Sequence, residues 1–438
     1  MRKTLLFAAV MAVMATTAQA QGIAGTWHGQ LDLQVMKLNL VFHFSKEKCT
    51  LDSPDQGAKG IAGEIKELDE KKVDAAFPSI GAAFSGDLKD GKIVGTFRQM
   101  GRELPLTLTA GELVRLRPQT PQPPYPYETR EVTFTNAEDK ATLAGTLTLP
   151  IDFDSSQAGK HPIVLMVTGS GLQDRDETLF DHRPFAVIAD YLARHGIASL
   201  RYDDRGFGQS TGDVSQATTL DFSRDAEAGI RYLQSLKEFS KVGILGHSEG
   251  GSIAFMLGAR QMVDFIVALA APGIKGDTLL VEQTNALLRL SGQPATMTLK
   301  QMRLTMFLQE TNPWYQFFTE YDPSGDIAAT RCPVFALNGS LDMQVLAESN
   351  LNAIYNLQLT IHNSQSNHQP STFNHQPSTF NHQPSTFNHQ PSTFKIYPGL
   401  NHLFQHAKTG ATTEYANIEE TISEEVLSDI AKWINSLE

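Results

Sequence analysis

The sequence predicts two folded domains: a small all-β barrel or sandwich, then a larger α/β domain with a mostly parallel, doubly wound sheet. A chain of 438 residues is too long for one ordinary domain. Short alternating apolar and polar runs occupy residues 21–115, whereas apolar strand runs alternate with amphipathic helical runs from His161 onward. A proline-rich stretch separates the two regions. These three observations together predict the fold class.

Residues 1–20 have the features of a secretory signal peptide. Arg2 and Lys3 make a positive start, and an apolar run follows from Leu5 to Met14. Small residues then stand at −3 and −1 of a cleavage point after Ala20. We therefore expect an exported protein, periplasmic or extracellular. We expect no membrane span, because no later segment has about 18 uninterrupted apolar residues.

The bulk composition is that of a globular protein. Apolar residues make up 41% and charged residues 19% of the chain, which is enough for a large core. The formal net charge of −12, with no basic run, argues against nucleic-acid binding. Cys49 and Cys332 are the only cysteines, and because they fall in different predicted domains we expect two unpaired thiols.

Residues 21–115 are predicted to form short strands separated by Gly, Asp and Lys turns. Runs such as "GTWHGQLDL", "KLNLVFHF" and "KIVGTFRQ" show no helical periodicity, which indicates a small antiparallel barrel or sandwich. Residues 116–127 form the predicted linker. Its five prolines favour an extended, semi-rigid spacer.

Residues 128–438 form the predicted α/β domain. "EVTFTN" and "ATLAGTLTLP" look like antiparallel strands, and "PIVLMVTG", "IASLRYDD" and "KVGILGHS" then alternate with helical patterns. Strands that are apolar throughout predict a parallel sheet covered on both faces. A helical segment at about 273–327 interrupts the alternation as a short cap. The alternation resumes at "CPVFALNG" and ends with the strand "FKIYPG" and a C-terminal helix.

The strongest chemical signal is a G-x-S-x-G motif at residues 246–250, between a predicted strand and a predicted helix. The glycines permit a sharp turn that exposes the serine. The helix N-terminus behind it presents free N–H groups to developing negative charge. We therefore predict Ser248 as a nucleophile.

A nucleophilic serine needs a base and an acid that orients the base. In a sheet of this kind the chain order is Ser, acid, His, each at the carboxyl end of a strand. Asp342 follows the predicted strand from Val334 to Leu337 and is the predicted acid, the alternative being an ordinary turn aspartate. His402 follows the last predicted strand and is the predicted base. His406 is the second candidate.

The oxyanion hole is expected to combine the backbone N–H groups of Glu249 and Ser170. Ser170 belongs to the loop "VTGSGLQDRDE" that follows the first parallel strand. Two such donors are typically worth several kcal/mol in the transition state. Residues 174–177 are either a solvated loop or a local salt-bridge cluster that holds this loop, and we favour the second, structural role. Asp204 and Arg205 are expected to brace the site rather than react.

"VTGSGLQDRDE", "RYDDRGFGQSTGD", "GHSEGG", "ALNGSLDMQV" and "PGLNHLFQ", in this order, resemble the α/β-hydrolase family, specifically exported bacterial carboxylesterases. The resemblance covers about Val167 to Gln405. It implies hydrolysis of carboxylic esters, small-molecule or carbohydrate-linked, through an acyl-enzyme on Ser248. It implies a Ser-His-Asp triad and neither cofactor nor metal. The cap is short for this family.

Two other functions fit parts of the sequence. A serine peptidase or an acyltransferase would use the same triad, and the motifs do not separate these activities from that of an esterase. A non-catalytic protein could instead bind a polymer through its β domain. The complete set of nucleophile, acid, base and oxyanion residues argues against that last alternative.

The heptapeptide NHQPSTF occurs four times without change from Asn367 to Phe394. A proline in every unit excludes a continuous helix, and one aromatic per unit cannot offset the entropy of ordering it. We expect a flexible loop before the final strand, at the edge of the sheet remote from Ser248. Its histidines could bind Zn²⁺ or Ni²⁺ weakly, but without nearby carboxylates or cysteines we expect no metal site.

Overall fold

The computed structural model describes residues 22–33, 37–56, 58–308, 312–365 and 392–437. The predicted signal peptide and most of the repeat lie outside these residues. The chain divides into two compact units, Met1–Val114 and Arg115–Glu438. Among the helices that the structure describes, none is long and apolar enough to cross a membrane.

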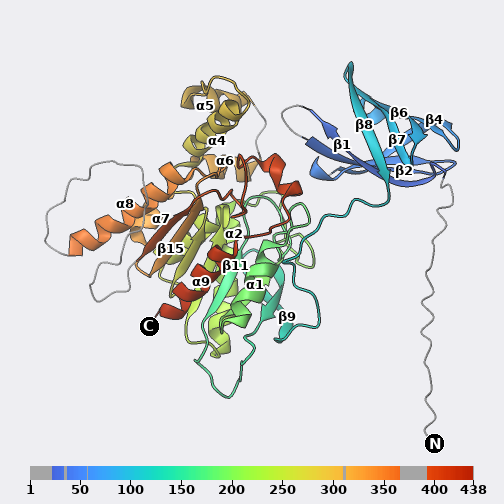
Figure 1. Cartoon of the computed structure of the whole chain (residues 1–438). Coiled ribbons are helices and arrows are strands. Elements are labelled where there is room, and N and C mark those ends of the chain that lie inside the picture. Colours follow the sequence, from blue (N-terminus) through green and yellow to red (C-terminus); the bar gives the residue numbers. More distant parts are fainter. Residues whose placement is uncertain (1–21, 34–36, 57, 309–311, 366–391, 438) are drawn as a thin grey trace, which may run out of the picture. The chain divides into compact units, whose positions relative to one another are not determined.

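The first unit contains a closed antiparallel barrel in which β1 to β8 follow one another in chain order and β1 pairs with β8 (Figure 1). The strands are β1 (Gly25–Asp32), β2 (Lys37–Phe44), β3 (Cys49–Ser53), β4 (Ala58–Leu68), β5 (Lys72–Phe77), β6 (Ala82–Lys89), β7 (Lys92–Gln99) and β8 (Arg102–Ala110). Short 3-10 turns lie at Pro54–Gln56 and Pro78–Ile80. The predicted β-rich fold of this region is confirmed.

Alternation along the strands explains the barrel interior. In β5, buried residues alternate with partly exposed ones, as expected for a strand with one face inward. The centre is aromatic: the ring of Phe42 lies 5.8 Å from that of Phe77 and 5.0 Å from that of Phe84, between centroids. Cys49 is a buried free thiol in this core.

The second unit is built on a mixed sheet with the strand order β16-β15-β14-β13-β11-β12-β10-β9. Its strands are β9 (Thr129–Asn136), β10 (Ala141–Thr148), β11 (Ile163–Val167), β12 (Ala198–Tyr202), β13 (Val242–His247), β14 (Ile266–Leu269), β15 (Val334–Gly339) and β16 (Thr393–Tyr397). β10 pairs antiparallel with both β9 and β12, and the strands β11 to β16 are parallel to one another. The predicted mostly parallel sheet is confirmed.

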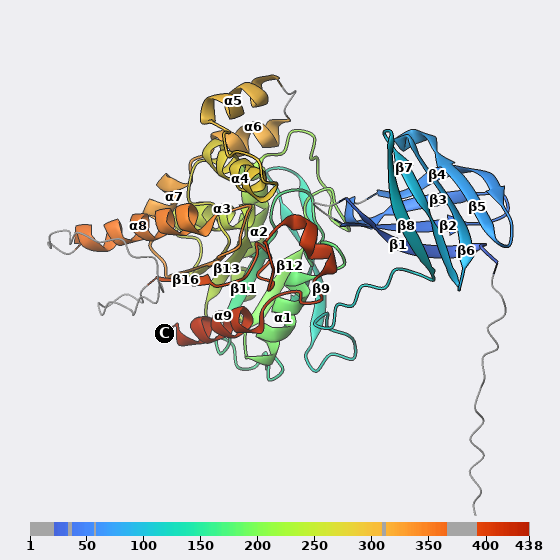
Figure 2. The same cartoon turned by 45° about the horizontal axis from the view of Figure 1, so that its top comes forward.

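Helices cover both faces of this sheet. α1 (Pro184–Arg194) and α9 (Glu424–Ser436) contact each other on one face. α2 (Thr219–Leu236), α3 (Glu249–Ala259), α7 (Ser324–Ala329) and α8 (Ala347–Gln365) pack on the other (Figure 2). A 3-10 turn at Thr412–Asn417 precedes α9.

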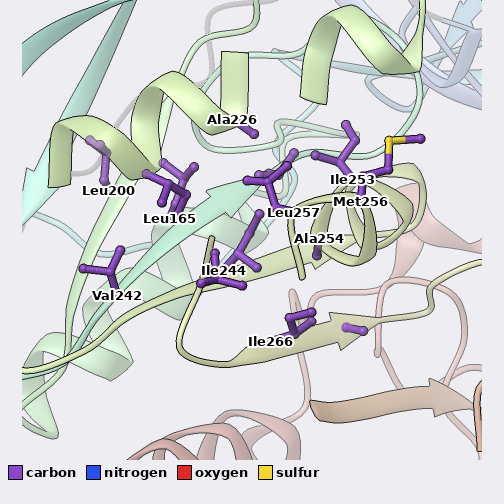
Figure 3. Packing of buried hydrophobic residues seen from close by; sticks show 14 of the residues in the cluster. Leu165, Leu200, Ala226, Val242, Ile244, Ile253, Ala254, Met256, Leu257 and Ile266 are labelled. Carbon is purple, nitrogen blue, oxygen red and sulfur yellow. The ribbon is translucent and has the colours of Figure 1, made fainter. Parts of the chain in front are cut away.

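Strand residues alternate between the two helical layers. In β11, Leu165 contributes to the core under α2 and α3, whereas its neighbours Val164 and Met166 contribute to the core under α1 and α9. Leu165 pairs with Ile244 of β13, and Figure 3 shows both in the same cluster as Leu257 of α3. All three are fully buried, and each such side chain contributes about 1.5–3 kcal/mol. A sheet buried on both faces explains why these strands are apolar throughout.

The segment between β14 and β15 forms the cap. α4 (Gly276–Leu290) contacts α5 (Leu299–Leu308) and α6 (Pro313–Glu320), and these helices gather at one end of the unit (Figure 2). α7 returns to the main body, where Ile327 is fully buried against α3 and α8.

The elements that flank the repeat are described even though residues 366–391 are not. α8 ends at Gln365 and β16 begins at Thr393. Thr393 pairs with Phe335 and Tyr397 pairs with Gly339. β16 therefore starts at the amino-terminal edge of the parallel strands and runs toward the opposite edge.

Candidate active site

The residues predicted to carry chemistry lie at the carboxyl ends of the parallel strands. Ser248 follows β13, Asp342 follows β15 and His402 follows β16. Ser248 and His402 line one cavity of about 520 Å³, together with Ser170 of the loop after β11. The topology thus brings together segments that are far apart in the sequence.

Ser248 occupies a sharp, left-handed turn between β13 and α3, with φ 53° and ψ −118°. A Cβ atom on Gly246 would lie 2.0 Å from the carbonyl oxygen of Gly250, and one on Gly250 would lie 2.2 Å from that of Val167. Real Cβ atoms do not approach backbone oxygens so closely. Both motif glycines are therefore required by close backbone approach, and the turn holds Ser248 at the cavity.

His402 and Asp342 form a buried pair in which Nδ1 of His402 lies 2.8 Å from Oδ2 of Asp342. The other oxygen, Oδ1, accepts from the backbone N–H groups of Gln344 at 2.8 Å and Val345 at 2.9 Å. Because these bonds fix the carboxylate, the carboxylate fixes the imidazole orientation. With Nδ1 facing Asp342, Nε2 is the ring nitrogen left to exchange a proton.

His406, the second candidate base, has a different environment. Its side chain is 68% exposed, and its Nδ1 lies 2.9 Å from Oε2 of Glu420. It is absent from the described residues that line the cavity. The geometry therefore favours His402.

The two predicted oxyanion donors flank Ser248. Glu249 is the first residue of α3, so its N–H has no acceptor within the helix. Ser170 lies on the cavity wall, and the preceding Gly169 passes so close that an added Cβ would lie 3.2 Å from Cβ of Ser248. The loop after β11 and the N-terminus of α3 thus both lie beside Ser248.

Residues 182–406, about half of the chain, match the family described as serine aminopeptidase, S33. The protein belongs to this family. Esterase EstD of Thermotoga maritima is 26% identical over 232 residues, covering 51% of this chain. The match spans 54% of that relative, or about half its length. The family member described here thus has the α/β-hydrolase fold, as the sequence resemblance implied.

Solved structures of low identity resemble this family member. An esterase of Pyrococcus furiosus is 16% identical with a TM-score of 0.45, over 75% of this chain and 99% of that chain. Est1E of Butyrivibrio proteoclasticus, solved with ferulic acid bound, is 15% identical with a TM-score of 0.41, over 68% of this chain and 96% of that chain.

The side chain of Glu249 joins the cap to the nucleophile turn, a contact that the sequence analysis missed. Its Oε1 accepts from Oγ1 of Thr219 at 2.6 Å and from Nε1 of Trp314 in α6 at 2.8 Å. Burial raises the pKa of Glu249, although hydrogen bonds from Thr219, Trp314 and Ser170 oppose this shift. Glu249, a predicted oxyanion donor, therefore also links α6 to the N-terminus of α3.

Asp204 holds both ends of the loop that carries Ser170. Its Oδ1 accepts from Oγ1 of Thr168 at 3.1 Å, and its Oδ2 accepts from N–H of Gln173 at 2.8 Å. Burial raises the pKa of Asp204 to about 8, against these hydrogen bonds, which favour the charged form. Asp204 therefore holds the loop in place. It is not among the described residues that line the cavity containing Ser248.

Ion pairs also lie close to the loop after β11 and to Asp204. Arg175 Nη2 lies 2.8 Å from Oδ2 of Asp203, and Arg205 Nε lies 2.6 Å from Oδ2 of the buried Asp225. In the described part of the chain, no group of three or more His, Cys, Asp or Glu side chains is arranged to hold a metal ion.

Proposed function

We propose that the protein is a serine carboxylesterase with Ser248 as nucleophile, His402 as general base and acid, and Asp342 as the acid that orients His402. The observation that carries the proposal is that Ser248, held in a strained turn, lines the same cavity as His402, which is hydrogen-bonded to Asp342. This arrangement supports acyl transfer.

The geometry supports a two-step reaction. His402 Nε2 takes the proton of Ser248 Oγ while Oγ attacks the ester carbonyl. The tetrahedral oxyanion faces the N–H groups of Glu249 and Ser170, and His402 then returns the proton to the leaving alcohol. A water molecule, activated by the same imidazole, attacks the acyl-enzyme and releases the carboxylic acid and free Ser248.

The cavity lining favours an uncharged acyl group. Most of its large side chains are apolar or aromatic: Leu172, Leu179, Leu279, Leu280, Trp314, Tyr315, Phe318, Val345 and Leu403. Among the described lining residues Glu177 is the one carboxylate, and its Oε1 already accepts from Gly169 and pairs with His247. An aminopeptidase must bind the ammonium group of its substrate, and a buried ammonium without a counter-charge costs several kcal/mol. We therefore infer an esterase rather than an aminopeptidase.

A matched pair of substrates tests this choice. p-Nitrophenyl 4-methylpentanoate and leucine p-nitrophenyl ester differ only in the α-amino group. At a pH where that amine is protonated, we expect kcat/KM for the neutral ester to exceed that for the amino ester by roughly 100-fold, because the cavity offers no spare counter-charge. The rates are followed by p-nitrophenolate release. A preference for the amino ester, together with turnover of leucine p-nitroanilide, would instead identify an aminopeptidase.

A shortened repeat gives a second test. β16, which follows the repeat, starts at the edge of the sheet opposite Ser248. We therefore expect deletion of three of the four units, roughly Asn367 to Asn388, to leave kcat on a p-nitrophenyl ester unchanged. Loop shortening itself should alter the free energy of unfolding by only about 1–3 kcal/mol. Steady-state kinetics and denaturant unfolding measure the two effects, and a large fall in kcat with the fold intact would refute the placement.

A further inference from the structure

Three backbone segments must stay in register around Ser248. They are the loop after β11 that carries Gly169 and Ser170, the turn at Ser248 itself, and the loop after β16 that carries His402. Displacements well below 1 Å weaken proton transfer and oxyanion binding, since both depend on short, directed hydrogen bonds. A direct contact between these segments would limit such displacements.

His247, the residue before the nucleophile, is in contact with the other two segments. Its Nδ1 lies 2.8 Å from Oε1 of Glu177, and its Nε2 lies 3.0 Å from the backbone carbonyl oxygen of His402. The side chain of His247 is only 7% exposed. A carbonyl oxygen can only accept, so Nε2 must carry a proton and donate it.

Glu177 completes the connection on the opposite side. The Oε1 atom that faces His247 also accepts from the N–H of Gly169 at 2.9 Å. This N–H belongs to the residue next to the predicted oxyanion donor Ser170. The side chain of Glu177 is 4% exposed, so both hydrogen bonds form away from solvent.

We propose that Glu177 and His247 are a buried positioning pair that holds the oxyanion loop and the His402 loop in register on either side of Ser248. The proposal rests on the serine-hydrolase function inferred above. Neither side chain needs to touch the reacting atoms for this role. They act through Gly169 and through the backbone of His402.

The protonation of the pair fits this role. His247 is packed against Glu177 and against the ring of His402, whose centroid lies 4.7 Å away, with Asp342 beyond that ring. Burial by itself would lower the pKa of His247, but the charge and hydrogen bond of Glu177 and the His402 carbonyl outweigh it and raise that pKa. Both ring nitrogens then donate, one to each neighbouring segment.

The local turn at Glu177 also directs its side chain inward. Glu177 has a left-handed backbone with φ 55°, which is unfavourable by about 1–2 kcal/mol for a residue with a Cβ atom. The turn is held by Asp174, whose carbonyl oxygen accepts from N–H of Glu177 and whose Oδ1 accepts from Asp176 and Thr178. A buried ion pair usually adds little to global stability. The position of the Glu177–His247 pair beside Ser248 is therefore better explained by its holding the two neighbouring loops in place.

The experiment compares Glu177→Gln, His247→Gln and the double variant with the wild type on a p-nitrophenyl ester. Glu420→Gln is the matched control, since Glu420 pairs with the exposed His406 in the same kind of Glu–His contact outside the cavity. Active sites are counted by fluorophosphonate titration carried to completion, so that unfolded molecules do not enter kcat. Circular dichroism reports folding.

We expect each single variant to lose roughly 30- to 100-fold in kcat per titrated site, with KM changed by less than about threefold, because geometry rather than binding is lost. The double variant should be no worse than the poorer single variant, since the two residues act as one unit. Glu420→Gln should keep the wild-type kcat. Fewer titratable sites with normal kcat per site would show a purely structural role and overturn the proposal, as would additive losses in the double variant.

The variant Ser248→Ala separates this inference from the proposed function. If Ser248→Ala loses activity while Glu177→Gln and His247→Gln keep full kcat per site, only the positioning pair is refuted. If Ser248→Ala remains fully active, the proposed serine mechanism itself fails.

Discussion

Replacing Ser248 with alanine is expected to lower kcat on a p-nitrophenyl ester by about 10⁴-fold or more. The change removes Oγ, the atom proposed to form the acyl-enzyme, and leaves the cavity and the predicted oxyanion donors in place. Residual activity over the uncatalysed rate can then come only from binding and oxyanion stabilisation. Steady-state kinetics measure the loss. Treatment of the variant with a fluorophosphonate first inactivates any contaminating active enzyme.

The same substitution should hardly affect folding. Ser248 has φ 53°, and alanine carries the same Cβ atom, so the strain of the turn is unchanged. Thermal unfolding should therefore occur at nearly the wild-type temperature. The exposed Ser215, changed to alanine, serves as the control and should retain full activity.

His402 gives an internal check on this prediction. In the proposed mechanism the imidazole acts only on the proton of Ser248 and on the later steps of the same cycle. The double variant Ser248→Ala/His402→Ala should therefore be about as active as Ser248→Ala alone. A further large loss in the double variant would mean that His402 supports a reaction in which Ser248 has no part. Retention of more than about a hundredth of the wild-type kcat in Ser248→Ala would contradict the nucleophile prediction directly.

Much of the architecture could be predicted because it depends on local pattern. Buried and exposed residues alternate in β5, whereas every residue of β13 is buried, so a period of two indicates the barrel and continuous apolar runs indicate the two-sided sheet. The turn at Ser248 could be predicted for the same reason, since its glycines and its serine lie within five consecutive residues. Asp342 and His402 followed from the positions of strand ends.

The contacts that complete the site could not be predicted in this way. Glu177 and His247 are 70 residues apart, and Trp314 and Glu249 are 65 residues apart. Neither pair lies at a spacing that a helix or strand would bring together. Their meeting depends on the path of a loop and on the docking of the cap, which are set by tertiary packing. The signal available in the sequence was a histidine directly before the predicted nucleophile, but its partner Glu177 had no local signature.

The second large effect is expected for Gly246→Ala and Gly250→Ala, which should destabilise the second unit by on the order of 3 kcal/mol or more. The new Cβ atoms would lie 2.0 Å from the carbonyl oxygen of Gly250 and 2.2 Å from that of Val167. Both obstacles are backbone atoms, so no side chain can rotate away to relieve the overlap. Either α3 must move away from β11 and β13, or the turn must change shape.

Thermal unfolding and kinetics together identify which of these occurs. Since each kcal/mol corresponds to about 2–4 °C in a domain of this size, the melting temperature should fall by roughly 6–12 °C. If the turn changes shape, the fluorophosphonate reactivity of Ser248 should fall as well, even well below the melting temperature. Gly325→Ala is the matched control: an added Cβ there meets no atom within 4 Å, and in α7 alanine has the better helix propensity. If Gly246→Ala and Gly250→Ala have the same melting temperature and fluorophosphonate reactivity as Gly325→Ala, the close backbone approach at the Ser248 turn is contradicted. The stated reason that the motif requires glycine would then be wrong as well.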